Sequence, residues 1–317
     1  MKENRWIATG YEAIVDGTGL CRQRLLKPKA DEVNTMIFGY STNAYTKFSL
    51  EASIARIAAL GFDGVEIMCD RPHLYPPDYD DAAIDLLVEL LRTHKLAVTN
   101  LNSFTLFAVG DTYLPSWIEP EAERRAIRIA HTKQCLRLAK RLGCPNISIP
   151  PGGPLGGMSR KEAIVRFYEG LEQVIPLAEF LRVKLLIEPE PNLLLERTSE
   201  FLDFIHAIES PWVGLNFDIG HFFCAGEDPA RSMDTLYPWI GHMHIEDIGS
   251  DRVHRHRIAG TGAIDFRSVF RQMKALDYQG AVSLELYPYV DMPDTAGKES
   301  RDFLLPLMAE AGISLNS

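Results

Sequence analysis

Short apolar runs alternate with longer amphipathic segments along most of the chain, starting at Met36. The runs are rich in β-branched and other apolar residues, and the apolar positions of the intervening segments follow helical spacing. The pattern predicts eight strand–helix units. The predicted strands cover residues 36–42, 64–69, 97–104, 146–152, 184–191, 213–220, 242–248 and 281–288.

The predicted helices follow these strands, and their ends carry recognisable signals. Ser49 is expected to cap the first helix and Gly61 to end it, because serine satisfies free backbone N–H groups and glycine adopts a left-handed turn. Asp228 and Asp265 are interpreted as caps of later helices. The predicted helices cover residues 49–62, 82–96, 121–143, 161–181, 198–210, 228–240, 265–276 and 298–313.

Eight strand–helix units favour a closed parallel barrel, the (β/α)8 or TIM barrel fold. Strands buried on both faces give near-continuous apolar runs, as observed here. A doubly wound open sheet is the alternative, but no GxGxxG motif follows the first strand. We expect residues 36–317 to form the barrel and catalytic domain, and residues 1–35 to be an N-terminal extension.

Composition narrows the class of function. A chain of 317 residues with 46% hydrophobic content can bury the core of one large domain. Its net charge of -10 disfavours nucleic acid, so we expect a small-molecule partner. The amino terminus lacks an apolar signal region and no run is long enough to span a membrane, which predicts a soluble, cytoplasmic protein. Five scattered cysteines without a CxxC pair indicate a reducing compartment.

Acidic side chains and one histidine end the last four predicted strands. Glu188 and Glu190 end the fifth strand, Asp218 and His244 end the sixth and seventh, and Glu285 lies on the eighth. Carboxyl ends of parallel strands meet at one rim, where these groups would repel one another without a cation. Oxygen-rich ligation with a single histidine favours Mn, Mg or Co over a structural zinc. The alternative for each acid alone is a helix cap or ion pair.

The order IEP, NFDIGH, HMHIED, GTG and LEL from Met36 onward resembles the xylose isomerase-like barrel superfamily. Within it, the chain is most similar to the D-tagatose and D-psicose 3-epimerases. The resemblance implies one divalent metal ion. Mn is the expected ion, and Mg, Co and Zn are the alternatives. It also implies that Glu188 and Glu285 are the acid/base pair and that His221 contacts substrate. The implied metal ligands are Glu188, Asp218, His244 and Glu285.

The chain departs from the family pattern in two places. Leu194 stands where the epimerases carry a second glutamate that holds a terminal hydroxyl, and Glu190, Asn192 and Glu196 are the candidates to replace it. The family's Pro-Gly-x-Gly turn is Ala259 to Gly262 here, with its glycines kept. Substrate identity therefore stays open.

Further polar residues are predicted near the barrel mouth. Glu66 and Asn102 are expected to reach into it, although Glu66 is equally compatible with an internal hydrogen-bond role. The segment 251–257, DRVHRHR, brings His254, His256 and Arg257 near the metal edge, where an anionic substrate group could bind. A solvated loop is the alternative for this segment. His242 is interpreted as a hydrogen-bonded core residue, and Trp117 as packed on the rim.

These features predict a metal-dependent epimerase or isomerase that acts on a ketose or related polyol ketone. A cation stabilises the enediolate that forms when a proton next to a carbonyl is removed. Two carboxylates can then exchange that proton across the substrate. The alternative is a metal-dependent lyase, either a keto-inositol dehydratase or an enzyme that cleaves C-glycosides. The net negative charge of the chain disfavours an abasic-site endonuclease of the same superfamily. A non-catalytic binding barrel is the last alternative. The sequence is also compatible with a homo-oligomer.

Overall fold

The structure is a computed structural model that describes residues 7–8, 11–15, 21–25 and 36–315. The chain divides into two units, residues 1–35 and 36–317. The described part of the first unit is a small antiparallel sheet that the sequence pattern did not predict. Its strands are β1 (Ile7–Ala8), β2 (Tyr11–Val15) and β3 (Cys21–Leu25).

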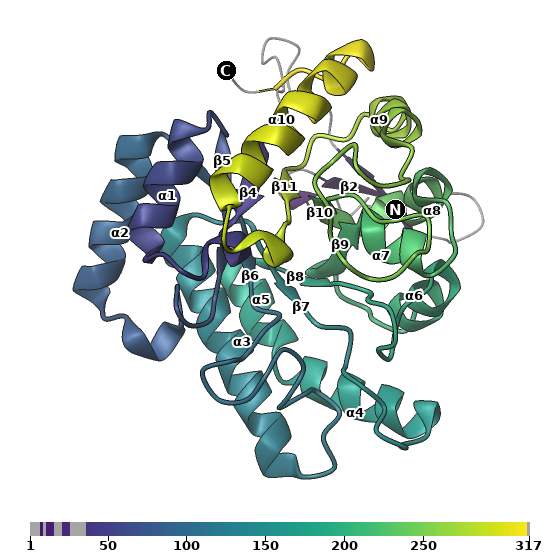
Figure 1. Cartoon of the computed structure of the whole chain (residues 1–317). Coiled ribbons are helices and arrows are strands. Elements are labelled where there is room, and N and C mark those ends of the chain that lie inside the picture. Colours follow the sequence, from purple (N-terminus) through teal and green to yellow (C-terminus); the bar gives the residue numbers. More distant parts are fainter. Residues whose placement is uncertain (1–6, 9–10, 16–20, 26–35, 316–317) are drawn as a thin grey trace. The chain divides into compact units, whose positions relative to one another are not determined.

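The second unit is a closed barrel of eight parallel strands with helices around it (Figure 1). Each strand pairs with its neighbour in chain order, and β11 closes the ring by pairing with β4. The (β/α)8 fold predicted from the sequence is thereby confirmed. The strands are β4 (Phe38–Ser41), β5 (Gly64–Met68), β6 (Ala97–Asn102), β7 (Asn146–Ile149), β8 (Lys184–Ile187), β9 (Val213–Asp218), β10 (Ile240–Ile245) and β11 (Val282–Leu284).

The helices form the outer layer, and three of them begin directly after the capping residues predicted from the sequence. Ser49, Asp228 and Asp265 each cap a helix by accepting a hydrogen bond from a backbone N–H of its first turn. The helices are α1 (Leu50–Ala59), α2 (Asp81–His94), α3 (Ala122–Leu142), α4 (Arg160–Glu172), α5 (Ile175–Leu181), α6 (Thr198–Ile205), α7 (Ile219–Cys224), α8 (Pro229–Leu236), α9 (Phe266–Ala275) and α10 (Pro293–Glu310). Single 3-10 turns are η1 (Thr42–Tyr45), η2 (Pro76–Asp78), η3 (Tyr237–Trp239) and η4 (Tyr287–Tyr289).

The structure differs from the predicted helices in several details. The segment 161–181 forms α4 and α5 rather than one helix, because Pro176 has no backbone N–H and its ring disfavours a continuous helix. The short helix α7 was not predicted. It begins directly at the end of β9, where the Asp218 side chain accepts a hydrogen bond of 2.8 Å from the backbone N–H of His221.

The core fills the barrel and the layer between strands and helices. Trp117, predicted at the rim, is fully buried and packs against Phe167. A side chain on Gly170 would come within 2.8 Å of the Trp117 ring, which explains why only glycine fits there. None of the described helices is both long and apolar enough to cross a bilayer. The four cysteines in the described barrel are not paired in disulfides.

Arg128 on α3 anchors the long loop that follows β6. Its guanidinium is fully buried and donates hydrogen bonds to the carbonyls of Pro115 at 2.9 Å and Phe104 at 2.8 Å. Buried carbonyls left without donors each cost about 1–3 kcal/mol. We therefore expect Arg128→Met to lower the free energy of unfolding by about 3 kcal/mol, measured by urea denaturation.

The matched control for this loop anchor is Arg137→Met on the same helix, where the side chain is exposed. Its effect should stay within about 0.5 kcal/mol of zero. Equal losses in the two variants would show that the buried hydrogen bonds of Arg128 do not hold the loop.

Candidate active site and metal centre

The acidic and histidine side chains at the ends of β8 to β11 converge. One ligand atom from each of Glu188, Asp218, His244 and Glu285 lies within 4.8 Å of the others, and all four residues are buried. Strand register explains the convergence: in β10, His244 lies beside Asp218 of β9 and Ser283 of β11. Glu188 and Glu285 come just after their strands, so both turn toward the same rim.

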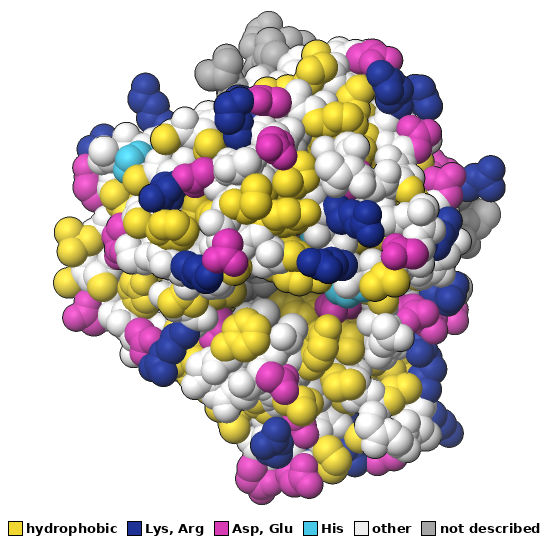
Figure 2. Space-filling view, in the orientation of Figure 1, with side chains coloured by type: hydrophobic (Ala, Val, Ile, Leu, Met, Phe, Trp, Pro, Cys, Tyr) yellow, Lys and Arg dark blue, Asp and Glu magenta, His cyan; other side chains and the backbone are white. Residues whose placement is uncertain are grey.

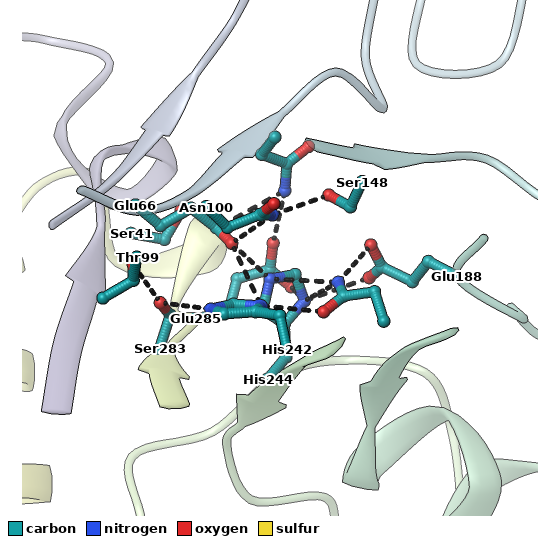
Figure 3. A network of polar contacts seen from close by, with 12 residues as sticks. Ser41, Glu66, Thr99, Asn100, Ser148, Glu188, His242, His244, Ser283 and Glu285 are labelled. Atoms are coloured by element: carbon teal, nitrogen blue, oxygen red, sulfur yellow. Dashed lines mark hydrogen bonds and ion pairs between the residues drawn. The ribbon is translucent and has the colours of Figure 1, made fainter. Parts of the chain in front are cut away.

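His244 is at the centre of this quartet. Figure 3 shows it beside Glu188 and Glu285. Its Nδ1 lies 3.0 Å from Glu188 Oε1, 3.5 Å from Asp218 Oδ2 and 3.6 Å from Glu285 Oε2. On the other side of the ring, Nε2 donates a hydrogen bond of 2.7 Å to Glu66 Oε2. This bond fixes the ring orientation and leaves Nδ1 facing the three carboxylates.

Each of the two glutamates has one oxygen held by an amide and one oxygen directed at His244. Asn216 Nδ2 donates to Glu188 Oε2 at 2.8 Å, and Asn43 Nδ2 donates to Glu285 Oε1 at 2.8 Å. Asn102 Nδ2 adds a longer bond of 3.3 Å to the same Glu285 oxygen. The amides therefore orient both carboxylates and leave Glu188 Oε1 and Glu285 Oε2 facing the centre.

Burial and crowding shift the acidities of these groups strongly. Burial raises the pKa of Glu285 well above its usual range; His244 opposes the shift and the charge of Glu188 adds to it. Burial alone would lower the pKa of His244, but the surrounding carboxylates, Glu285 first, reverse this and raise it. Burial would raise the pKa of Glu66, yet His244 lowers it to about 2. The negative charges of the buried carboxylates at the site therefore exceed the positive charge that His244 can supply.

The donor set suits a divalent cation. Three carboxylates and one imidazole are ligands for Mn, Mg, Co or Zn, and the His244–Glu66 bond is the usual outer contact of a metal-bound histidine. Among the described residues, Asp218 Oδ2 accepts no hydrogen bond although it is buried. Such an oxygen is costly unless a cation or proton satisfies it. Glu188, Asp218, His244 and Glu285 could thus hold one metal ion.

The structure brings most of the other predicted substrate residues to this site. His221 Nε2 lies 3.5 Å from Asp218 Oδ2, and His256 Nδ1 lies 3.5 Å from Glu285 Oε2. Glu66 and Asn102 are both buried beside the quartet. His242 is a hydrogen-bonded core residue, with Asn216 and Ser283 on its two nitrogens.

Asn192 and Arg257 are not brought into the quartet. The Asn192 side chain is exposed, and its backbone N–H donates to Glu196 at 2.8 Å. Arg257 pairs through its backbone with Asp247, and its guanidinium lies against Gly249. No hydrogen bond or ion pair between described residues joins either side chain to the four central groups.

Three further residues at the site are absent from the predicted set of site residues. Asn43 lies on η1, just past β4, and contacts Glu285 directly. Tyr113, in the loop after β6, donates a 2.7 Å hydrogen bond to Glu190, whose pKa burial raises to about 7. Glu246, just past β10, is fully buried and accepts a hydrogen bond from the Gly220 N–H. Only Glu246 had a sequence signal, a carboxylate following a buried strand.

Fold and site together define a (β/α)8 barrel with a carboxylate–histidine centre at the carboxyl ends of its strands. The chain belongs to the xylose isomerase-like TIM barrel family, whose model matches residues 54–307. Relatives also match by sequence, including these two. An uncharacterised protein, MJ1311, of Methanocaldococcus jannaschii is 28% identical over 83% of this chain and 88% of its own. L-ribulose-5-phosphate 3-epimerase UlaE of Salmonella paratyphi C is 24% identical over 80% of this chain and 88% of its own.

Solved structures share the fold over nearly their whole length. A D-tagatose 3-epimerase-like protein matches with a TM-score of 0.71 at 23% identity, covering 85% of this chain and 98% of its own. The IolI protein with a bound zinc atom matches with a TM-score of 0.71 at 19% identity. The match covers 87% of this chain and 99% of the IolI chain. The predicted resemblance to the xylose isomerase-like barrels and the ketose 3-epimerases is confirmed.

Proposed function

We propose that this protein is a divalent-metal-dependent epimerase of a ketose or a related polyol ketone. The observation that carries the proposal is the convergence of Glu188 and Glu285 on one centre, each with a single oxygen free of amide contacts. Relatives named as sugar 3-epimerases support the reaction class. The zinc-bound structural neighbour supports the capacity of the fold to hold a metal ion.

In the proposed reaction, one glutamate removes the proton next to the substrate carbonyl and the other returns a proton to the opposite face. Glu188 follows β8 and Glu285 follows β11, with β9 and β10 between them in the barrel. The two carboxylates therefore approach from different sides of a shared centre. Asn216 and Asn43 hold them in place, so that Glu188 Oε1 and Glu285 Oε2 carry the transferred proton.

A divalent ion on the quartet would act as a Lewis acid that stabilises the negative charge of the enediolate. His221 orients the substrate from the adjacent turn of α7, where its Nδ1 is held by the Pro189 carbonyl at 2.9 Å. Glu190 and Tyr113 form a second polar contact at the same mouth. The quartet, His221 and Glu190 are buried, which excludes water and strengthens their interactions.

The reaction class is tested by incubating the protein with Mn²⁺ and a panel of ketoses and ketose phosphates in deuterated water. A two-base epimerase should yield the epimer with one solvent deuterium at the inverted carbon, detected by NMR. A dehydrated or aglycone-free product would instead support the lyase alternative and contradict the proposal. No turnover with any ketose would contradict it as well.

Glu66→Gln should weaken metal binding by about 10–100-fold. The glutamine cannot supply the negative charge that now accepts the His244 Nε2–H at 2.7 Å, so His244 becomes a poorer ligand. Isothermal titration with Mn²⁺ measures the change. The matched control is Glu162→Gln on the surface of α4, which should leave affinity unchanged. Equal affinity in Glu66→Gln and the wild type would show that Glu66 does not tune the site.

A further inference from the structure

Cys69, Cys135 and His131 form a buried thiol cluster outside the candidate metal centre. Cys69 directly follows β5, and the other two residues lie on the buried face of α3. Both cysteine side chains are fully buried, and neither belongs to a disulfide. A buried cysteine by itself is only a small core residue. The neighbours of these two thiols give them a different chemistry.

His131 and Cys135 form a thiol–imidazole pair. The two residues are four positions apart on α3, so their side chains lie on one face of the helix, one turn apart. His131 Nε2 lies 3.5 Å from Cys135 Sγ. An imidazole at this distance can take the thiol proton and stabilise the thiolate as an ion pair, which is how reactive cysteines are activated.

Two buried polar groups near the thiol cluster lack a partner. Among the described residues, Ser103 Oγ and Arg128 Nη2 have no hydrogen-bond partner. The two residues are neighbours, since Arg128 Nη1 donates to the Ser103 carbonyl at 3.4 Å. Burial lowers the pKa of Arg128 to about 10, and the charges of Asp70 and Cys135 oppose this shift. A negative charge on Cys135 would therefore compensate polar groups that are otherwise costly to bury.

The acidities of the two thiols shift in opposite directions. Burial raises the pKa of Cys69 well above its usual range, and the contact with Cys135 adds to this shift. Burial acts in the same direction on Cys135, but its contacts with Cys69 and His131 outweigh burial and hold the pKa of Cys135 well below its usual range. The cluster thus combines one thiol with thiolate character and a second, protonated thiol beside it. Redox-sensing cysteines share this arrangement.

Tyr75 lies between the thiol cluster and solvent. Its half-buried ring stacks on the His131 ring, with 6.1 Å between the ring centroids. The exposed guanidinium of Arg71 lies over the Tyr75 ring, 5.1 Å from its centroid. The cluster is therefore one aromatic side chain below the surface. Movement of Tyr75 would open a path for an oxidant as small as hydrogen peroxide.

We propose that Cys135 is a peroxide-reactive thiol and that Cys69 resolves its oxidised form. The Cys135 thiolate attacks one oxygen of hydrogen peroxide, the O–O bond breaks, and the departing hydroxide takes the proton held by His131 and leaves as water. Cys135 is then a sulfenic acid. The Cys69 sulfur displaces the sulfenic hydroxyl, which takes the Cys69 proton and leaves as a second water. One peroxide is thereby reduced to two waters, and two thiols are oxidised to a disulfide.

Two other cysteines of the barrel provide internal comparisons. Cys144 Sγ donates a hydrogen bond of 3.1 Å to the Asn146 carbonyl, and burial raises the pKa of Cys144 to about 12. Cys224 is half-buried, and burial likewise raises its pKa to about 12. A reaction controlled by access would select Cys224, the more exposed thiol. A reaction controlled by thiolate character would select Cys135.

Peptide mapping of the full-length protein tests the assignment. A Cys21→Ser variant keeps only the four thiols of the barrel. It is treated with an equimolar amount of hydrogen peroxide, and the remaining free thiols are then blocked. The expected product is a pair of peptides joined by a Cys69–Cys135 disulfide that dithiothreitol reduces, with Cys144 and Cys224 still recovered as thiols. Oxidation of Cys224 first, or no oxidation of Cys69 and Cys135, overturns the proposal.

Further variants in the same background separate the roles of the three residues. Cys69→Ser should stop at a Cys135 sulfenic acid, which dimedone traps, whereas Cys135→Ser should leave Cys69 unoxidised. His131→Gln should slow oxidation of Cys135 by about tenfold, the change in thiolate fraction that one pKa unit gives. The matched control is His206→Gln, an exposed histidine, which should leave the rate unchanged. Equal rates in the two histidine variants would overturn activation by His131. Peptide mapping does not use turnover, so failure here leaves the proposed function intact.

Discussion

Glu285→Gln is expected to lower kcat by about 10³-fold, because the amide can neither accept nor deliver the proton that inverts the substrate carbon. The change preserves shape: the glutamine oxygen can still accept the hydrogen bonds that Asn43 and Asn102 now donate to Glu285 Oε1. Loss of activity should therefore occur without loss of fold. Steady-state kinetics, circular dichroism and the bound metal content are measured on the same preparation.

The two-base arrangement makes a sharper prediction for the paired variants. Glu285→Gln and Glu188→Gln should each stop epimerisation, and each should still exchange the proton of only one epimer with solvent, through the remaining carboxylate. Glu162→Gln on α4 is the control and should behave as the wild type. Exchange of both epimers in a single variant would mean that one base serves both faces, and would contradict the assignment.

Removal of divalent metal is expected to abolish turnover and to lower the melting temperature. Three buried carboxylates within 4.8 Å of one another repel when no cation lies between them. Saturation with Mn²⁺ at about 100 times its dissociation constant should add about 2.7 kcal/mol to the free energy of unfolding. Thermal unfolding is followed after chelation and after Mn²⁺ is restored.

His244→Gln provides the control for metal-linked stability, since it removes the central ligand of the quartet. In this variant the melting temperature should depend only weakly on Mn²⁺. A wild-type melting temperature that is the same with chelator and with Mn²⁺ would contradict a metal role for the quartet. Basic and acidic side chains are mixed on the face shown in Figure 2. We therefore expect no broad Mn²⁺ binding to that face.

The barrel and the convergence of its acidic ends were predictable because both follow from backbone rules. Parallel strands share register, so residues at equal stages of β9 and β10, such as Asp218 and His244, must lie side by side. Glu188 and Glu285 follow from the same argument. Helix caps such as Ser49 were predictable because capping needs only local sequence.

Contacts that depend on loops were not predictable from the sequence. Asn43 and Tyr113 reach the site from a 3-10 turn and a long loop, and no periodicity fixes where such side chains point. The segment 251–257 shows the same limit: its histidines turn inward and Arg252 turns out over Phe223, although the sequence alone treats them alike. Asn192, a predicted substrate contact, is exposed because a left-handed turn directs it away from the buried groups.

Anomalous diffraction from a crystal soaked in Mn²⁺ tests the central claim most directly. The account predicts a strong peak that lies within about 2.2 Å of a ligand atom from each of Glu188, Asp218, His244 and Glu285. A well-ordered crystal with no peak among these four side chains, or with a peak that contacts only one or two of them, would contradict it.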